Sequence, residues 1–170
     1  MGKEQAHILL GYKFKIDKDD IQAFSLLSRI LSYRMAFDLR EEQGLAYSLG
    51  ISDGHEGDYG WLTAYIGTGV ENIDIALDGV KKYYHTSAIS DLDADEIRKT
   101  VNAGKGKYLR RNLTRIGQAF YMGYYDYYYD DYSLAADRYS QLDEITVDRL
   151  KEVADKYLML PENHTLLIVK

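Results

Sequence analysis

The spacing of apolar residues changes several times along this chain, and the order of these changes constrains the fold more than any other feature. Apolar residues that alternate or run together over short segments predict strands, and a 3.6-residue spacing predicts helices. The predicted strands are residues 6–14, 45–52, 59–68 and 164–170, and the predicted helices begin near residues 20, 73, 93 and 146. This order gives a β-α-β-β-α-β skeleton. It predicts an α+β fold, a ferredoxin-like sandwich extended by extra helices.

Several residues mark the expected ends of these elements. Asp20 is a good N-cap for the first helix, and Gly44 stands where a C′ glycine would end it. Asp93 and Glu96 have the spacing of a capping box. The helix after them contains two glycines, at positions 104 and 106, which together cost about 2 kcal/mol relative to alanine. We therefore expect that helix to break or bend, and residues 53–58 to form the turn of a hairpin.

Length and composition restrict the class of protein. A chain of 170 residues with one proline and no low-complexity linker predicts a single domain over residues 1–170. No apolar run approaches the ~20 residues that a membrane-spanning helix needs, so we expect no membrane span. The formal net charge of −6 argues against nucleic acid as a partner. The absence of cysteine excludes disulfides and thiolate metal sites.

Two segments have an unusual composition, and each has two interpretations. The basic residues between positions 97 and 125 form either a solvated helix or a surface for an acidic partner. The stretch "FYMGYYDYYYDDY", residues 120–132, holds many of the 17 tyrosines. Its rings either pack on the domain with their hydroxyls in water, or form a contact surface for another domain.

The chain shows no complete catalytic motif. The four histidines lack the H-E-x-x-H and H-x-x-E-H spacings of helical zinc sites, and no serine stands in G-x-S-x-G. The carboxylates are scattered without a spacing that selects an acid/base pair. We therefore expect no catalytic residue and no metal ligand in this chain. The histidines, expected at the surface or at strand ends, are His7, His55, His85 and His164.

The junction "FDLREEQGLAYSLGIS" places a cation and a phenol on either side of one glycine. Arg40 in a last helical turn is favourable for the helix dipole alone. Tyr47 shares the parity of the neighbouring apolar residues at 45, 49 and 51, so simple burial would explain it. The other interpretation is that the turn presents Arg40 and Tyr47 together to a ligand.

The string "LREEQGLAYSLGIS", followed by "GDYGWLTAYIGTGVENIDIALDGV", resembles the C-terminal, non-zinc half of pitrilysin/insulinase-type zinc peptidases. This family includes the mitochondrial processing peptidase. The resemblance covers roughly residues 6–169, and the lack of a zinc motif agrees with the non-zinc half. The chain departs from the family in having "RILSYRMAFD" where a Gly-Gly-Ser-rich run often stands.

The resemblance implies a function shared between two halves. In that family two homologous halves close over an extended peptide, one of them holding zinc, while the other supplies an Arg and a Tyr at the positions of Arg40 and Tyr47. It implies that this chain binds no cofactor itself, that zinc sits on a homologous partner domain or subunit, and that an extended peptide is the substrate. A catalytically inactive member that binds peptides or acts as a scaffold is the alternative, and a stand-alone ferredoxin-like ligand-binding domain is a third.

Overall fold

The computed structural model describes residues 5–111, 113–137 and 141–170. Contacts within the chain group into two compact units, Met1–Leu92 with Val147–Lys170, and Asp93–Thr146. The single domain expected from the sequence stays a prediction.

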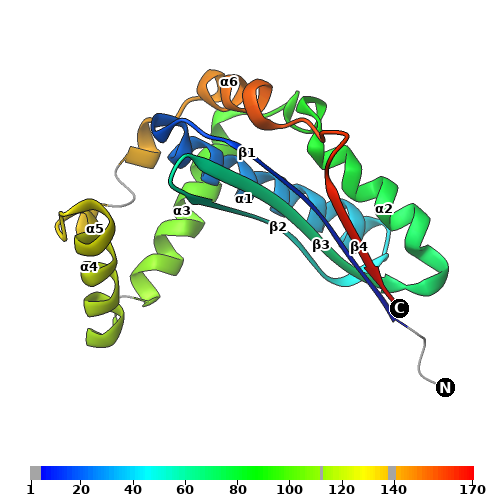
Figure 1. Ribbon diagram of the computed structural model, residues 1–170, viewed down its shortest axis with the longest axis horizontal. Helices are drawn as coiled ribbons and strands as arrows, with labels where there is room; N and C mark the ends of the chain where they lie inside the picture. Colours follow the sequence, from blue (N-terminus) through cyan, green and yellow to red (C-terminus); the bar gives the residue numbers. More distant parts are fainter. Residues whose placement is uncertain (1–4, 112, 138–140) are drawn as a thin grey trace. The chain divides into compact units, whose positions relative to one another are not determined.

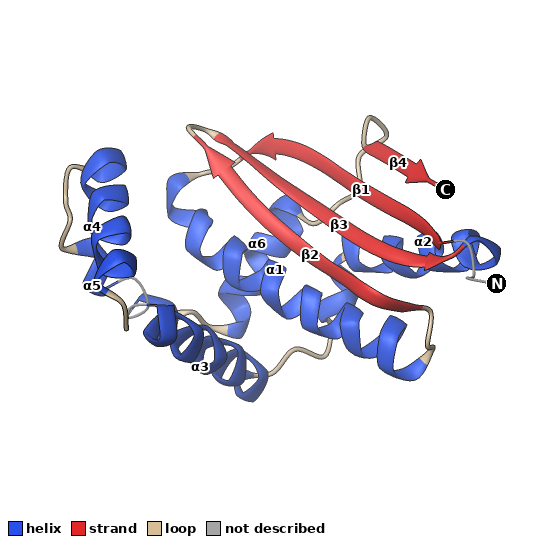
Figure 2. Ribbon diagram, turned by 90° about the horizontal axis from the view of Figure 1, so that it is seen from below, coloured by secondary structure: helices blue, strands red, loops and turns tan. Residues whose placement is uncertain are grey.

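The first unit is built on a four-stranded antiparallel sheet with the strand order β2-β3-β1-β4 (Figures 1 and 2). The strands are β1 (Gln5–Lys15), β2 (Ala46–Glu56), β3 (Tyr59–Gly69) and β4 (Thr165–Val169). The two strands joined by the first helix, β1 and β2, are separated by β3, which is the split arrangement of ferredoxin-like domains. The predicted α+β fold is confirmed.

The helices divide between the two units. Those of the first unit are α1 (Ile21–Ala36), α2 (Ile73–Lys81) and α6 (Val147–Tyr157), and those of the second are α3 (Ala94–Arg111), α4 (Arg115–Tyr129) and α5 (Leu134–Asp137). Segments of 3-10 or π-helix are η1 (Lys18–Asp20), η2 (Phe37–Glu42), η3 (Val70–Asn72), η4 (Lys82–Tyr84), η5 (Thr86–Ile89) and η6 (Gln141–Glu144). The predicted capping at Asp93 is present, because the Glu96 backbone N–H donates to the Asp93 carboxylate at 2.8 Å.

Of the predicted break or bend in helix α3, the break is wrong, because the helix runs through both of its glycines, while the bend stays a prediction. The propensity cost of two glycines is small and is opposed by other interactions of the same helix. Asp95 pairs with Lys99 one turn later at 2.7 Å, and Ile97 and Val101 are buried.

The core lies between the sheet and its three helices. Alternate residues of β1, among them Ile8, Leu10 and Tyr12, are buried on the face that α1, α2 and α6 cover (Figure 2). This is the period-2 burial of a sheet with one covered face. The other face carries partly exposed side chains such as Leu9 and Trp61.

The hairpin between β2 and β3 is tighter than predicted. The strands pair as far as Glu56 and Tyr59, so the turn is only Gly57 and Asp58, with Gly57 in the left-handed region at φ +56°. The prediction of a turn over residues 53–58 was wrong because polar side chains at a strand end resemble a turn. His55 and Glu56 in fact belong to the paired ladder.

Strand β2 forms one edge of the sheet, and α1 covers the middle of that edge. The Ile51 backbone N–H donates to the Ser32 hydroxyl of α1 at 3.0 Å. One turn earlier on α1, the Ser28 hydroxyl donates to the Asp53 carboxylate. The first of these bonds satisfies an amide that an uncovered edge strand would leave open, and the second ties the strand to the helix through side chains.

Helix α2 packs against the end of the first helix through a glycine. Leu39, which belongs to η2, is fully buried. A Cβ built at Gly79 of α2 would lie 2.7 Å from the Leu39 Cδ2 atom. Glycine at position 79 therefore permits this packing.

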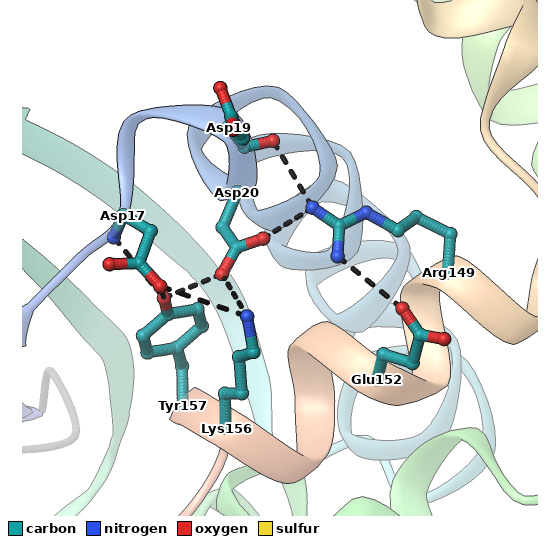
Figure 3. Close-up of polar contacts among 7 residues, drawn as sticks. All are labelled: Asp17, Asp19, Asp20, Arg149, Glu152, Lys156 and Tyr157. Carbon is teal, nitrogen blue, oxygen red and sulfur yellow. Dashed lines mark hydrogen bonds and ion pairs between the residues drawn. The ribbon is translucent and has the colours of Figure 1, made fainter.

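A polar cluster joins the start of α1 to α6 (Figure 3). The Asp20 carboxylate, with only 2% of its side chain exposed, accepts hydrogen bonds from Tyr157 at 2.6 Å, from Lys156 at 2.9 Å and from Arg149. Asp20 is the residue before α1, as predicted, but its side chain makes no capping bond to the helix. It serves the contact between helices instead.

The charge of Asp20 is maintained by its partners. Burial by itself would raise the pKa of the Asp20 carboxyl, but the hydrogen bonds from Tyr157, Lys156 and Arg149 outweigh it, and the pKa lies below its usual value. A carboxyl with a lowered pKa stabilises the fold above its unfolded pKa near 4, and this contribution is lost as pH falls through the folded value.

We expect Asp20→Asn to lower the free energy of unfolding at pH 7 by about 2–3 kcal/mol, because it removes a charge that accepts three hydrogen bonds. Chemical denaturation from pH 7 to pH 3 measures this. The difference from the parent protein should shrink below about pH 4, where the carboxyl of the unfolded parent chain begins to take up a proton. A difference that stays constant over this range would contradict the role of the charge.

We expect Gly79→Ala to destabilise the protein, because overpacking against Leu39 costs about 1–3 kcal/mol and exceeds the gain of about 1 kcal/mol from better helix propensity. Gly106→Ala in α3 is the matched control, since an added Cβ meets nothing within 4 Å there. Thermal unfolding followed by circular dichroism should show a lower Tm for the first variant and no loss for the second. Equal Tm changes would refute the packing argument.

Candidate functional site

The junction between α1 and β2 starts with a widened helical turn. After α1 the backbone continues as the π-helical segment η2, and the Gln43 N–H donates to the Asp38 carbonyl five residues back at 3.0 Å. Gly44 follows in the left-handed region at φ +63°, as predicted for a glycine that ends a helix. π-Helical turns occur frequently at functional sites.

Arg40 lies within this π-helical segment, next to the buried Leu39. Its side chain is half-exposed, and its Nε donates to the Glu41 carboxylate at 2.8 Å. The buried Leu39 thus anchors this backbone segment in the core, while the neighbouring Arg40 presents its guanidinium to solvent.

Tyr47 occupies a β-bulge. The pairing of β2 with β3 steps from Ala46 opposite Thr68 to Ser48 opposite Gly67, so Tyr47 is an extra residue with no partner in the ladder. Ala46 and Ile51 are both buried although they lie five positions apart. One inserted residue is what allows both of them to face the helices.

The bulge leaves the Tyr47 side chain 91% exposed. The interpretation that Tyr47 is simply buried with Leu45 and Ile51 is therefore wrong, because it assumed an uninterrupted strand. The Thr68 hydroxyl donates to the Leu45 carbonyl at 2.7 Å and fixes the backbone where β2 begins. The sequence signal for the bulge was Ala46. It is apolar like Ile51 but lies an odd number of positions away, so a regular strand would point the two side chains to opposite faces.

In the described part of the chain, no hydrogen bond, ion pair or ring contact joins Arg40 to Tyr47. The structure therefore places both candidate residues at the same helix-to-strand junction, each on an irregular element and each reaching solvent. Such an arrangement can offer two hydrogen-bond donors to a ligand, because the two side chains do not bond to each other.

The uncovered sheet face contains aromatic residues that the sequence analysis did not select. The ring of Trp61 lies over Gly54 of β2, where a Cβ would clash with it. The Tyr65 hydroxyl is 2.9 Å from the His7 Nδ1 atom, and the two rings stack with centroids 5.9 Å apart. This face therefore has both apolar rings and a polar pair.

Within the residues that the structure describes, no group of three His, Asp or Glu side chains could hold a metal ion. His7 contacts Tyr65, and the His164 Nδ1 atom lies 2.7 Å from the Pro161 carbonyl. None of the described helices combines the length and the apolar character needed to cross a membrane.

Solved structures share this fold at low sequence identity. The chain superposes on an inactive peptidase domain from Bordetella parapertussis with a TM-score of 0.81 and 12% identity, covering 100% of this chain and 94% of that one. It also superposes on part of the periplasmic protease PqqL from Escherichia coli with a TM-score of 0.79 and 13% identity, covering 99% of this chain and 19% of that one.

Sequence comparison gives a closer relationship. The zinc protease YmxG of Bacillus subtilis (strain 168), described as uncharacterized, is 29% identical in an alignment of 111 positions that covers 62% of this chain and 27% of that protein. The chain thus spans about a quarter of the length of this relative. The family model of the peptidase M16 inactive domain matches residues 1–103, more than half of the chain, and the chain therefore belongs to the peptidase M16 inactive domain family.

Proposed function

We propose that this chain is the substrate-binding half of a zinc-dependent endopeptidase, and that Arg40 and Tyr47 contact a peptide held at zinc on a homologous domain or subunit. The observation that carries this proposal is the exposure of Tyr47, 91%, on a bulge directly after the turn that exposes Arg40. A phenol in a regular strand at this position would have been buried.

The absence of a metal cluster in the described residues supports a division of labour. A zinc ion would have to be held by another half, and this agrees with membership of a family of inactive domains. The relatives named as proteases are several times longer than the matched region, and so have room for a second half. The resemblance to pitrilysin/insulinase-type zinc peptidases implies a substrate in an extended conformation.

Arg40 and Tyr47 have the chemistry for binding a peptide. A guanidinium and a phenol both donate hydrogen bonds, and each stabilises a carbonyl oxygen more strongly as negative charge develops on it. The Glu41 carboxylate accepts a hydrogen bond from Nε of Arg40, which leaves the two Nη groups of the guanidinium able to donate to a ligand. Zinc on the other half would act as a Lewis acid on the same carbonyl.

The alternative is a catalytically inactive member that binds peptides or serves as a scaffold. The described residues of this chain contain no group of metal ligands, and a partner half without such a group would favour this alternative. An H-x-x-E-H sequence in the partner half would support the peptidase, and its absence would support the scaffold.

We expect Arg40→Ala and Tyr47→Phe each to lower kcat/KM for an unstructured peptide by about 10²-fold in the peptidase assembled with its zinc-bearing half, the typical cost of removing one such donor. Both side chains reach solvent, so the Tm should stay within about 1 °C of the parent value. Tyr33→Phe and Arg110→Ala, at other exposed positions, are the matched controls and should retain full activity.

Unchanged cleavage by both variants would show that the assigned roles are wrong. If the parent assembly binds peptide but shows no metal-dependent turnover, the scaffold alternative is correct.

A further inference from the structure

Helix α4 presents an apolar stripe to solvent. None of its residues is buried, and Ile116, Phe120 and Tyr127 are exposed by 84%, 64% and 79%. The opposite side of the helix makes the contacts within its own unit, where the ring of Tyr121 lies 5.8 Å from that of Tyr108. In an amphipathic helix such an apolar stripe is normally buried against another element.

The stripe has the spacing and shape of a helix-packing surface. Ile116, Ala119, Phe120, Gly123 and Tyr127 recur every three or four residues and share one face. Ala119 and Gly123 are small, and a Cβ built at Gly123 meets nothing within 4 Å. Another helix can therefore approach closely at the middle of the stripe, with the large side chains packing on either side.

The charges around the stripe are complementary to those of a second copy in antiparallel orientation. Arg115 is exposed at the N-terminal end of α4, and Asp126 and Asp130 are exposed at its C-terminal end. Antiparallel pairing would bring the basic end of each helix beside the acidic end of the other and would oppose the two helix dipoles. A two-fold axis repeats this match on both sides, as a self-complementary interface requires.

We infer that α4 is the interface of a homodimer, in which the apolar stripes of two copies of this chain pack antiparallel. The two-fold axis passes between Phe120 and Gly123, so that Phe120 of one copy packs on Gly123 of the other. Ile116 of one copy then faces Tyr127 of the other. This interface is independent of the Arg40 and Tyr47 site.

Cysteine cross-linking tests the pairing, because the natural chain contains no cysteine. Two copies of residue 116 would lie about 16 Å apart along the helices, at about 1.5 Å per residue, beyond the ~7 Å that a disulfide spans between Cα atoms. Mild oxidation should therefore join Ile116→Cys to Tyr127→Cys in a mixture of the two variants and leave each variant alone uncross-linked. Cross-linking of each variant with itself and not in the mixture would overturn the antiparallel register.

Sedimentation of the 170-residue chain tests the dimer itself. The parent chain should dimerise at micromolar concentration, and Phe120→Arg should raise the dimer dissociation constant at least tenfold without lowering the Tm of the monomer. Ile75→Arg, at an exposed apolar position of α2, is the matched control and should leave the dimer unchanged. A monomeric parent chain, or a Phe120→Arg variant whose own Tm falls, would overturn the inference, since the stripe would then be covered by the chain itself or by a different partner.

Discussion

The Asp20 carboxylate is the interaction on which the first unit depends, because it joins segments that are 129 residues apart in the chain. The polypeptide leaves this unit after Leu92 and returns to it at Val147. On its return, α6 is held to the start of α1 by Arg149, Lys156 and Tyr157 around one buried anion. Hydrophobic burial brings the two helices together, but the bonds to one anion require them to meet at one relative position.

Most of the fold could be predicted because β1, β3 and the helices of the first unit each bury one face. Burial on one face imposes a period of two on the strands and of 3.6 on the helices, and these periods are visible in the sequence. The prediction failed where the pattern has another cause. The polar residues His55 and Glu56 end a strand, and Gly104 and Gly106 lie in a continuous helix.

The candidate site was only partly predictable. Periodicity indicated a helix, a glycine turn and a strand, while the roles of Arg40 and Tyr47 came from the family resemblance. The π-helical turn depends on which carbonyl each amide selects, and this selection leaves no regular spacing in the sequence. The bulge left only one trace, the apolar Ala46 at the opposite parity to Ile51, which does not by itself distinguish a bulge from a regular strand. His7 was expected to be an ordinary surface or strand-end residue. Its contact with Tyr65 joins residues 58 positions apart, which no local pattern could reveal.

The hydroxyl of Ser32 has a consequence for how this domain can hold a polypeptide. Outer strands often recruit a further chain by main-chain pairing, a mode that reads backbone shape more than side-chain identity. Here the amide of Ile51 is already occupied by the helix behind it, so the sheet cannot be lengthened across the centre of β2. A segment that binds over the centre of β2 is therefore held by side chains at the junction or on the open aromatic face, and its own side chains then determine how well it fits.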